Sequence, residues 1–164
     1  MEQLDALSKK ISFGTDGNQY LTFALGHEQY GIEILKVQEI KGYLPPTAVP
    51  NTPGYIKGVM NLRGTIIPIV DLRAKLGLAE TEYNQFTVII VATIGSKVVG
   101  LIVDSVSDVL NIPQSDIQEA PEFGAAVDVR FIDGMAKAGE KIVMLLNMSK
   151  IIADGDLDIA QEAN

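Results

Sequence analysis

Short apolar runs, separated by glycine, proline and polar turns, recur along this chain. Runs of this length that are rich in β-branched and aromatic residues are typical of strands. The pattern therefore predicts a mainly β protein with short helices. The predicted strands cover residues 20–25, 30–34, 66–70, 86–94, 97–103, 106–112 and 141–148, and residues 35–40 fit either a strand or a short turn.

The stretch GVMNLRGTIIPIVDLRAKLG, residues 58–77, contains one predicted strand with both of its ends. Ile66–Val70 is apolar throughout, as in a strand covered on both faces. The preceding N-L-R-G predicts a turn, in which Gly64 is free to take a positive φ and Asn61 tolerates the left-handed conformation. Arg63 would then stand at the tip of this turn as an unpaired cation with apolar neighbours.

Other local signals mark helices and loops. Asp71 predicts the N-cap of a short helix that ends at Gly77, and Ser149 predicts the start of another. Residues 44–54 contain four prolines and must form an irregular loop or edge segment. A second long loop is expected at residues 113–130.

The sequence repeats itself once, with an offset of 69 and then of 76 positions. Each half would supply about five short strands and a helical turn, the content of a small barrel, and is marginal for a core of its own. We expect one domain over residues 19–153, made of two barrels at about 19–85 and 86–153 that share an apolar interface, with exchange of terminal strands allowed. The glycine matches are Gly26 with Gly95, Gly31 with Gly100, and Gly58 with Gly134.

The two halves differ at the turn that carries Arg63. Its counterpart in the second half is Gly139, within K-A-G-E in place of N-L-R-G. If Arg63 only stabilised its barrel, the second barrel would need an equivalent. The difference favours a recognition role for Arg63.

Composition excludes several classes of function. The chain has 164 residues and a net charge of −8, without the basic patches that nucleic acids or anionic membranes attract. It has no cysteine for disulfides or thiolate chemistry, no apolar run long enough to span a membrane and no visible secretion signal. We expect a cytosolic protein with a flexible segment at residues 1–18 and an acidic tail at 154–164.

An enzyme has little support. His27 is the only histidine and falls in a predicted hairpin turn, which excludes a histidine metal cluster. No phosphate-binding glycine motif is present. Asp104 and Asp108 could be paired carboxylates, but their surroundings indicate strand ends. We expect a binding protein without a cofactor.

Four segments of the chain form a recognisable set: KVQEIKGY (36–43), NTPGYIKGVMNLRGTIIPIVDLR (51–73), VVGLIVDSVSDVL (98–110) and APEF (120–123). Together they resemble the CheW-like domain family of chemotaxis coupling proteins. The resemblance extends over about residues 20–152 and implies two SH3-like, five-stranded β-barrels. On this resemblance, no kinase, phosphotransfer or receiver segment remains to be placed.

The resemblance implies a stand-alone adaptor that couples chemoreceptors (methyl-accepting chemotaxis proteins) to the histidine kinase CheA. Its expected partners are the chemoreceptor cytoplasmic tip and the regulatory domain of CheA. We expect a cytoplasmic protein, recruited to membrane-associated receptor clusters and monomeric when isolated. The alternative is a related adaptor of another chemosensory or pilus-motility pathway.

The family's receptor surface is a groove between the barrels that takes a helical hairpin. The three valines at matching positions could equally belong to the core, and the two glycines could serve backbone geometry. Arg63 could be structural, paired with Glu39. The matching positions are Val37, Gly58, Arg63, Val88, Gly100 and Val109.

The family's kinase surface matches Glu39, Ile40 and Lys57 on the first barrel, with a second contact at Phe123. Ile40 between charged neighbours suits an apolar anchor with a polar rim. An ordinary edge strand kept soluble by charges would look the same. Phe123, in a long loop, could instead fold back on its own barrel.

Overall fold

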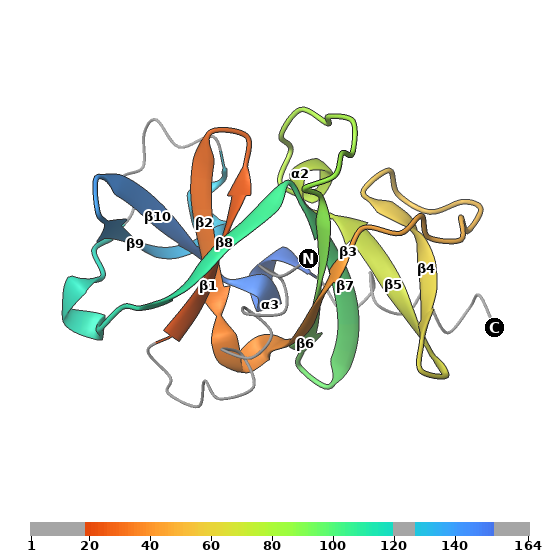
Figure 1. The fold of residues 1–164 in the computed structure, drawn as a ribbon, viewed down its shortest axis with the longest axis horizontal. Coiled ribbons are helices and arrows are strands. Elements are labelled where there is room, and N and C mark those ends of the chain that lie inside the picture. The colour runs from red at the N-terminus through yellow and green to blue at the C-terminus, as the bar shows by residue number, and fades with distance from the viewer. Residues whose placement is uncertain (1–18, 120–126, 153–164) are drawn as a thin grey trace.

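The computed structural model describes residues 19–119 and 127–152. Within them, ten strands form two five-stranded sheets that lie side by side (Figure 1). The strands are β1 (Gln19–Leu25), β2 (Glu28–Glu33), β3 (Val37–Gly42), β4 (Ile56–Leu62), β5 (Thr65–Asp71), β6 (Val88–Ile94), β7 (Lys97–Val103), β8 (Ser105–Asn111), β9 (Ile132–Ala138) and β10 (Lys141–Leu146). The short helices are η1 (Ile34–Lys36), α2 (Leu72–Lys75), η2 (Gln114–Asp116), η3 (Val129–Phe131) and α3 (Met148–Ile151).

We name the two sheets by their strand orders. Sheet A runs β8-β1-β2-β10-β9, and sheet B runs β3-β6-β7-β5-β4. Neighbouring strands are antiparallel except for the parallel pairs β2–β10 and β5–β7. The predicted fold class, mainly β with two five-stranded SH3-like units and short helices, is confirmed.

The two sheets exchange their hairpins. The β1–β2 hairpin begins the chain in sheet A, whereas β3 to β7 all belong to sheet B, and the chain returns to sheet A at β8. The backbone crosses between the sheets at β2–β3 and at β7–β8. Residue 85 therefore does not separate the sheets, and sheet B takes strands from both sides of it.

A single backbone bridge joins the two edges of each sheet. Thr47, beyond β3, pairs with Val59 of β4, and Gln118, beyond β8, pairs with Met135 of β9. Glycine precedes the bridged residue on both β4 and β9. A Cβ on Gly58 would lie 2.1 Å from the carbonyl oxygen of Thr47, and one on Gly134 would lie 2.9 Å from that of Gln118.

The internal repeat is visible in the strand register as well. In sheet B, Ile69 of β5 pairs in parallel with Gly100 of β7. In sheet A, the equivalent Leu145 of β10 pairs in parallel with Gly31 of β2. Both pairs obey the offsets of 69 and 76 that the sequence shows.

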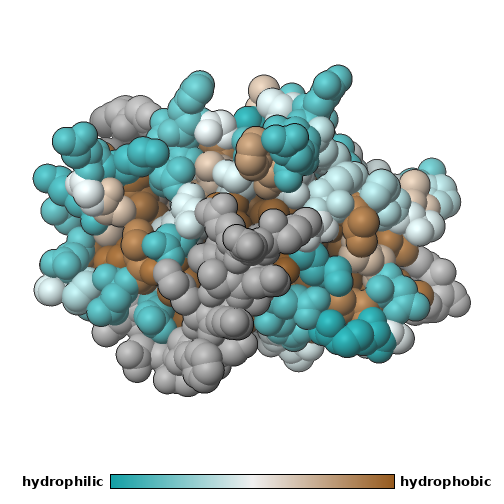
Figure 2. Space-filling model, in the orientation of Figure 1, coloured by the Kyte–Doolittle hydropathy of each residue, from teal (hydrophilic) through white to brown (hydrophobic). Residues whose placement is uncertain are grey.

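The largest apolar cluster takes residues from both sheets, including Phe23 and Ile32 of sheet A and Ile90 and Leu101 of sheet B. Smaller clusters lie within each sheet, around Ile69 in sheet B and Leu145 in sheet A. The shared cluster is the apolar interface that the small size of each half predicts. Figure 2 shows a largely polar outer face, with apolar residues in smaller patches between polar side chains.

The sequence analysis missed two strands and displaced one helix. β4 and β9 were not predicted, because each contains a glycine and polar residues at its bridged edge. Residues 34–36 form η1 before β3 begins, so both alternatives for residues 35–40 are realised in succession. α3 begins at Met148 with Asn147 as its N-cap, not at Ser149.

The predicted ends of α2 are confirmed. The side chain of Asp71 accepts a hydrogen bond from the backbone N–H of Ala74, and Gly77 follows the helix with φ +78°. The N–H of Leu78 donates to the carbonyl of Arg73 at 2.8 Å, which completes a glycine-terminated cap.

Candidate protein-interaction surface

The turn between β4 and β5 holds Arg63 in an unusual backbone conformation. Leu62 pairs with Thr65, so Arg63 and Gly64 form a two-residue hairpin loop, with φ values of 50° and 89°. Two-residue hairpin loops favour positive φ at the first position or, as in this loop, at both, and glycine adopts such values freely whereas arginine does not. The left-handed conformation costs a non-glycine residue roughly 1–2 kcal/mol.

Asn61 has a different role from the one predicted. Its backbone is part of β4, and its side-chain oxygen accepts a hydrogen bond from the N–H of Gly64 at 2.8 Å. The residues with positive φ in this turn are Arg63 and, as predicted, Gly64. Asn61 therefore stabilises the turn through its side chain.

Arg63 forms an ion pair and remains accessible. Its Nη1 lies 2.9 Å from a carboxylate oxygen of Glu39 in β3, while 66% of its side chain is exposed. Glu39 lies 3.7 Å from Lys41 as well. Arg63 is thus not the unpaired cation of the sequence reading. It is a largely exposed guanidinium held from one side by Glu39.

A shallow hollow of about 290 Å³ lies beside this ion pair. Its floor is apolar and its rim is polar, an arrangement that suits a protein partner better than a small charged substrate. The lining residues are Gln38, Leu62, Arg63, Thr65, Ile67 and Val98.

The other positions that match the family's receptor surface lie mostly in the core. Val37 and Val88 are 7% and 5% exposed and belong to the cluster shared by the sheets. Val109 in β8 is half-buried against the same cluster. In the isolated chain, Val37 and Val88 are therefore core residues.

Gly58 and Gly100 occupy crowded backbone sites. Gly58 has φ +146° and lies against the Thr47 bridge. A Cβ on Gly100 would come within 2.6 Å of Ile69. Both glycines are explained by close approach, as the structural alternative in the sequence analysis proposed.

Of the positions that match the kinase surface, the two charged residues are partly exposed, but the predicted apolar anchor is buried. Ile40 is 7% exposed and lies in the shared core, so it is not an exposed anchor; the second sheet covers it. Glu39 and Lys57 are partly exposed, and Lys57 pairs with Glu80 at 2.5 Å. Phe123 lies outside the described residues.

Two exposed apolar side chains lie at the end of β3 and at the start of β6. The N–H of Tyr43 donates to the carbonyl of Thr87, which extends the β3–β6 register beyond the strands. This register brings Leu44 and Phe86, 56% and 63% exposed, to the same end of sheet B.

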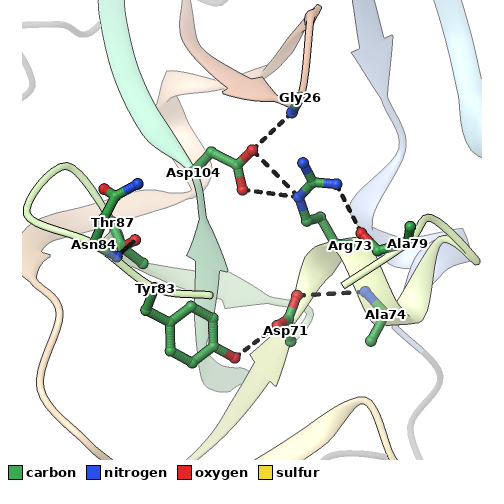
Figure 3. Close-up of polar contacts among 9 residues, drawn as sticks. All are labelled: Gly26, Asp71, Arg73, Ala74, Ala79, Tyr83, Asn84, Thr87 and Asp104. Carbon is green, nitrogen blue, oxygen red and sulfur yellow. Dashed lines mark hydrogen bonds and ion pairs between the residues drawn. The ribbon is translucent and has the colours of Figure 1, made fainter. Parts of the chain in front are cut away.

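The sequence analysis did not find the polar network around α2 (Figure 3). Arg73 donates from Nε to both oxygens of Asp104, at 3.0 and 3.2 Å, and from Nη1 to the carbonyl of Ala79. Asp104 also accepts from the N–H of Gly26 at 2.7 Å. The partners are distant in sequence, and no local pattern signals them.

Asp71 has a second partner across the connector that follows α2. The hydroxyl of Tyr83 donates to its Oδ2 at 2.6 Å, and the Tyr83 ring lies 4.5 Å from that of Tyr43. Burial raises the pKa of Tyr83 far above its usual value, and the hydrogen bond to Asp71 adds to the shift. Tyr83 therefore stays protonated as a donor to a buried carboxylate.

The residues weighed for catalysis are otherwise engaged. Asp104 belongs to the network of Arg73, and Oδ1 of Asp108 accepts from the N–H of Val109 at 2.8 Å. His27 is exposed in the β1–β2 turn. Across residues 19–119 and 127–152 no three His, Asp or Glu side chains are grouped as metal ligands. No helix in these ranges is long and apolar enough to cross a membrane.

Comparisons with known proteins agree with this geometry. The CheW-like domain model matches residues 19–156. Chemotaxis protein CheW of Klebsiella aerogenes is 43% identical over 152 residues, 93% of this chain and 92% of that protein. A probable chemotaxis protein CheW of Rhizobium etli is 34% identical over 91% of this chain and 96% of its own.

A solved structure gives the same result for the fold. The scaffolding protein TtCheW from Thermoanaerobacter tengcongensis superimposes with a TM-score of 0.78 at 30% identity, covering 89% of this chain and 95% of that one. The family match spans both sheets, both crossovers and the Arg63 turn. This chain belongs to the CheW-like domain family.

Proposed function

We propose that this protein is an adaptor that couples chemoreceptors to the histidine kinase CheA. The observation that carries the proposal is the family match over residues 19–156, which includes the Arg63 turn. Its relatives carry the name chemotaxis protein CheW, and a structural neighbour is described as a scaffolding protein. The protein would act in the cytoplasm, recruited to membrane-associated receptor clusters, as a monomer without a cofactor.

Arg63 would be the main polar contact for the receptor tip. Its guanidinium is exposed, oriented by Glu39, and adjacent to a hollow with an apolar floor. A helical hairpin could place an apolar side chain in the hollow and a carboxylate on the guanidinium. The half-buried Val109 would add an apolar contact to this surface. The buried positions Val37, Gly58, Val88 and Gly100 would stabilise the strands that carry it.

The kinase surface would lie on sheet B along β3 and β4. Glu39, Lys41 and Lys57 offer a charged rim of both signs, and such rims contribute to specificity more than to affinity. The apolar anchors in this proposal are the exposed Leu44 and Phe86, since Ile40 is buried in the shared core. Phe123 remains a prediction for a second contact with the kinase.

The proposal is tested by titration calorimetry with two purified partners, the regulatory domain of CheA and a receptor cytoplasmic fragment. We expect both to bind, Phe86→Ser to weaken only the kinase, and Arg63→Gly to weaken only the receptor. Val129→Ser is the matched control, because Val129 is also exposed but lies outside both proposed surfaces. A folded protein that binds neither partner would overturn the proposal.

A further inference from the structure

Within residues 19–119 and 127–152, few polar contacts join sheet A to sheet B, and these contacts can restrain the orientation of one sheet relative to the other. The chain crosses between them only twice among the described residues, at β2–β3 and at β7–β8. In Figure 1, the β7–β8 crossover lies beside α2 at the upper side of the molecule, and the β2–β3 crossover lies at the lower side. The hydrophobic effect that drives burial in the shared core is non-directional, so polar contacts between the sheets add the directional restraint.

Asp104 stands at the upper crossover, between β7 and β8, and joins three elements there. One oxygen accepts from the N–H of Gly26, in the β1–β2 turn of sheet A. Both oxygens accept from Arg73 of α2, which follows β5 of sheet B. The N–H of Asp104 donates to the carbonyl of Ala24 at 3.2 Å. The carboxylate is therefore shared between the two sheets (Figure 3).

Arg73 is itself held in place, so its contact with Asp104 can restrain the position of sheet A relative to sheet B. Only 14% of its side chain is exposed, and its Nη1 is fixed by the carbonyl of Ala79 at 2.8 Å. A Cβ on Gly26 would lie 3.4 Å from its Nη2, so the guanidinium fills the space between the turn and Asp104. The Nε–H shared by the two Asp104 oxygens and the Nη1 bond to Ala79 hold the planar guanidinium at two edges, which restrains direction as well as distance.

The contacts among Gly26, Arg73 and Asp104 at the β7–β8 crossover have no counterpart among the described residues at the β2–β3 crossover, although the sequence repeat gives equivalent positions there. By the offsets of 69 and 76, the positions equivalent to Gly26, Asp104 and Arg73 are Gly95, Leu35 and Ser149. Leu35 is 60% exposed at the lower crossover and Ser149 is exposed. Nothing lies within 4 Å of the Cβ direction of Gly95. A contact needed merely to build a sheet would be present in both copies.

We propose that Arg73 and Asp104 form a clasp that sets the orientation of sheet A relative to sheet B at the β7–β8 side. They are positioning residues, because neither needs to touch a partner. A partner that contacts both sheets depends on their relative orientation, whereas a partner that contacts one sheet does not. This last consequence rests on the proposed function, whose receptor surface takes Arg63 from sheet B and Val109 from sheet A: the receptor fragment should be sensitive to the clasp and the kinase domain should not.

The clasp is tested by a distance measurement that needs no partner. The chain has no cysteine, so Ser96→Cys in the β6–β7 turn and Lys137→Cys in β9 place one spin label on each sheet. Pulsed double electron–electron resonance then reports the distance between sheets. We expect Asp104→Ala and Arg73→Ala to shift or broaden the distance distribution with circular dichroism unchanged. Arg130→Ala, which removes the ion pair with Asp128, should leave it unchanged.

An unchanged distribution in folded Asp104→Ala and Arg73→Ala proteins would overturn the clasp, as would an equal change in the control. If Asp104→Ala does not fold, Arg73→Lys decides, because it keeps the charge and loses the two-oxygen geometry. In the calorimetric titrations, Asp104→Ala should bind the receptor fragment more weakly and the kinase domain as the wild type does. If the distance between the sheets changes but the affinity for the receptor fragment does not, the orientation of the sheets does not control receptor binding. If the wild type binds neither partner, the proposed function is wrong. The clasp is then still tested by the distance measurement, which needs no partner.

Discussion

At the scale of single residues, Arg63 combines an unfavourable backbone with an accessible side chain. Its equivalent, Gly139, also has a positive φ, of +65°, which glycine adopts with no steric cost. A fold that needed only the turn would be better served by glycine. The exposed ion pair with Glu39 contributes little stability, since such pairs are worth about 0–1 kcal/mol. The small stabilising contribution of the guanidinium is the reason we propose a role in recognition for it.

Two replacements of Arg63 separate these roles. Arg63→Gly removes the side chain and relieves the strained backbone, whereas Arg63→Ala removes the same side chain and keeps much of the strain. We expect Arg63→Gly to be more stable than Arg63→Ala by about 1 kcal/mol in urea unfolding, with both losing receptor binding. A loss of several kcal/mol in Arg63→Gly would show that the ion pair is structural.

Ile40, unlike Arg63, is expected to matter for stability. Its side chain lies in the shared core, so Ile40→Asp should bury an unpaired charge and destabilise the protein by several kcal/mol. Ile40→Val, the conservative control, should cost about 0.5–1.5 kcal/mol. Denaturant unfolding measures both. A native stability for Ile40→Asp would mean that the residue is exposed in solution.

At the scale of elements, each sheet is held by a few contacts at its edges. The Thr47–Val59 and Gln118–Met135 bridges join the segments beyond β3 and β8 to the edge strands β4 and β9. The N-caps of α2 and α3 end β5 in sheet B and β10 in sheet A. Asp71 and Asn147, both N-caps, are equivalent by the offset of 76. The elements repeat even where the surface chemistry differs.

The bridge in sheet B depends on the absence of a side chain at Gly58. Gly58→Ala should separate Thr47 from Val59, because the new Cβ would overlap the carbonyl of Thr47 and φ is +146°. We expect a loss of roughly 2–4 kcal/mol and faster hydrogen exchange at the amide of Val59. Gly54→Ala is the matched control, with nothing within 4 Å of its Cβ direction. Equal effects of the two substitutions would contradict the role of the bridge.

The connector after α2 depends on the hydroxyl of Tyr83. Tyr83→Phe should cost about 1.5–3 kcal/mol at neutral pH, because the buried Asp71 carboxylate loses a donor. The folded state raises the pKa of Tyr83 above 10.0, so the unfolded state releases this proton first. The hydroxyl's contribution is full below pH 10.0 and falls as the pH rises above it. Tyr83→Phe should therefore cost less at high pH; a constant difference would contradict the assignment.

At the scale of the whole molecule, the fold class and the duplication are readable from the sequence. Runs such as Ile66–Val70 specify strands, and Asp71 with Gly77 specifies the helix that follows. The exchange of hairpins is not readable, because both halves carry the same pattern and each hairpin fits either sheet. The burial of Ile40 depends on the second sheet, and the contact of Arg73 with Asp104 joins distant residues. Local patterns carry no information about either.

The central claim is that this chain couples a receptor to a kinase, and reconstitution tests it most directly. CheA phosphorylation would be measured with receptor-containing membranes, with and without this protein. We predict receptor-dependent activation of the kinase only when the protein is present, lost in Arg63→Gly and retained in Val129→Ser. Folded protein that binds CheA yet leaves kinase activity unchanged by receptor would contradict the claim.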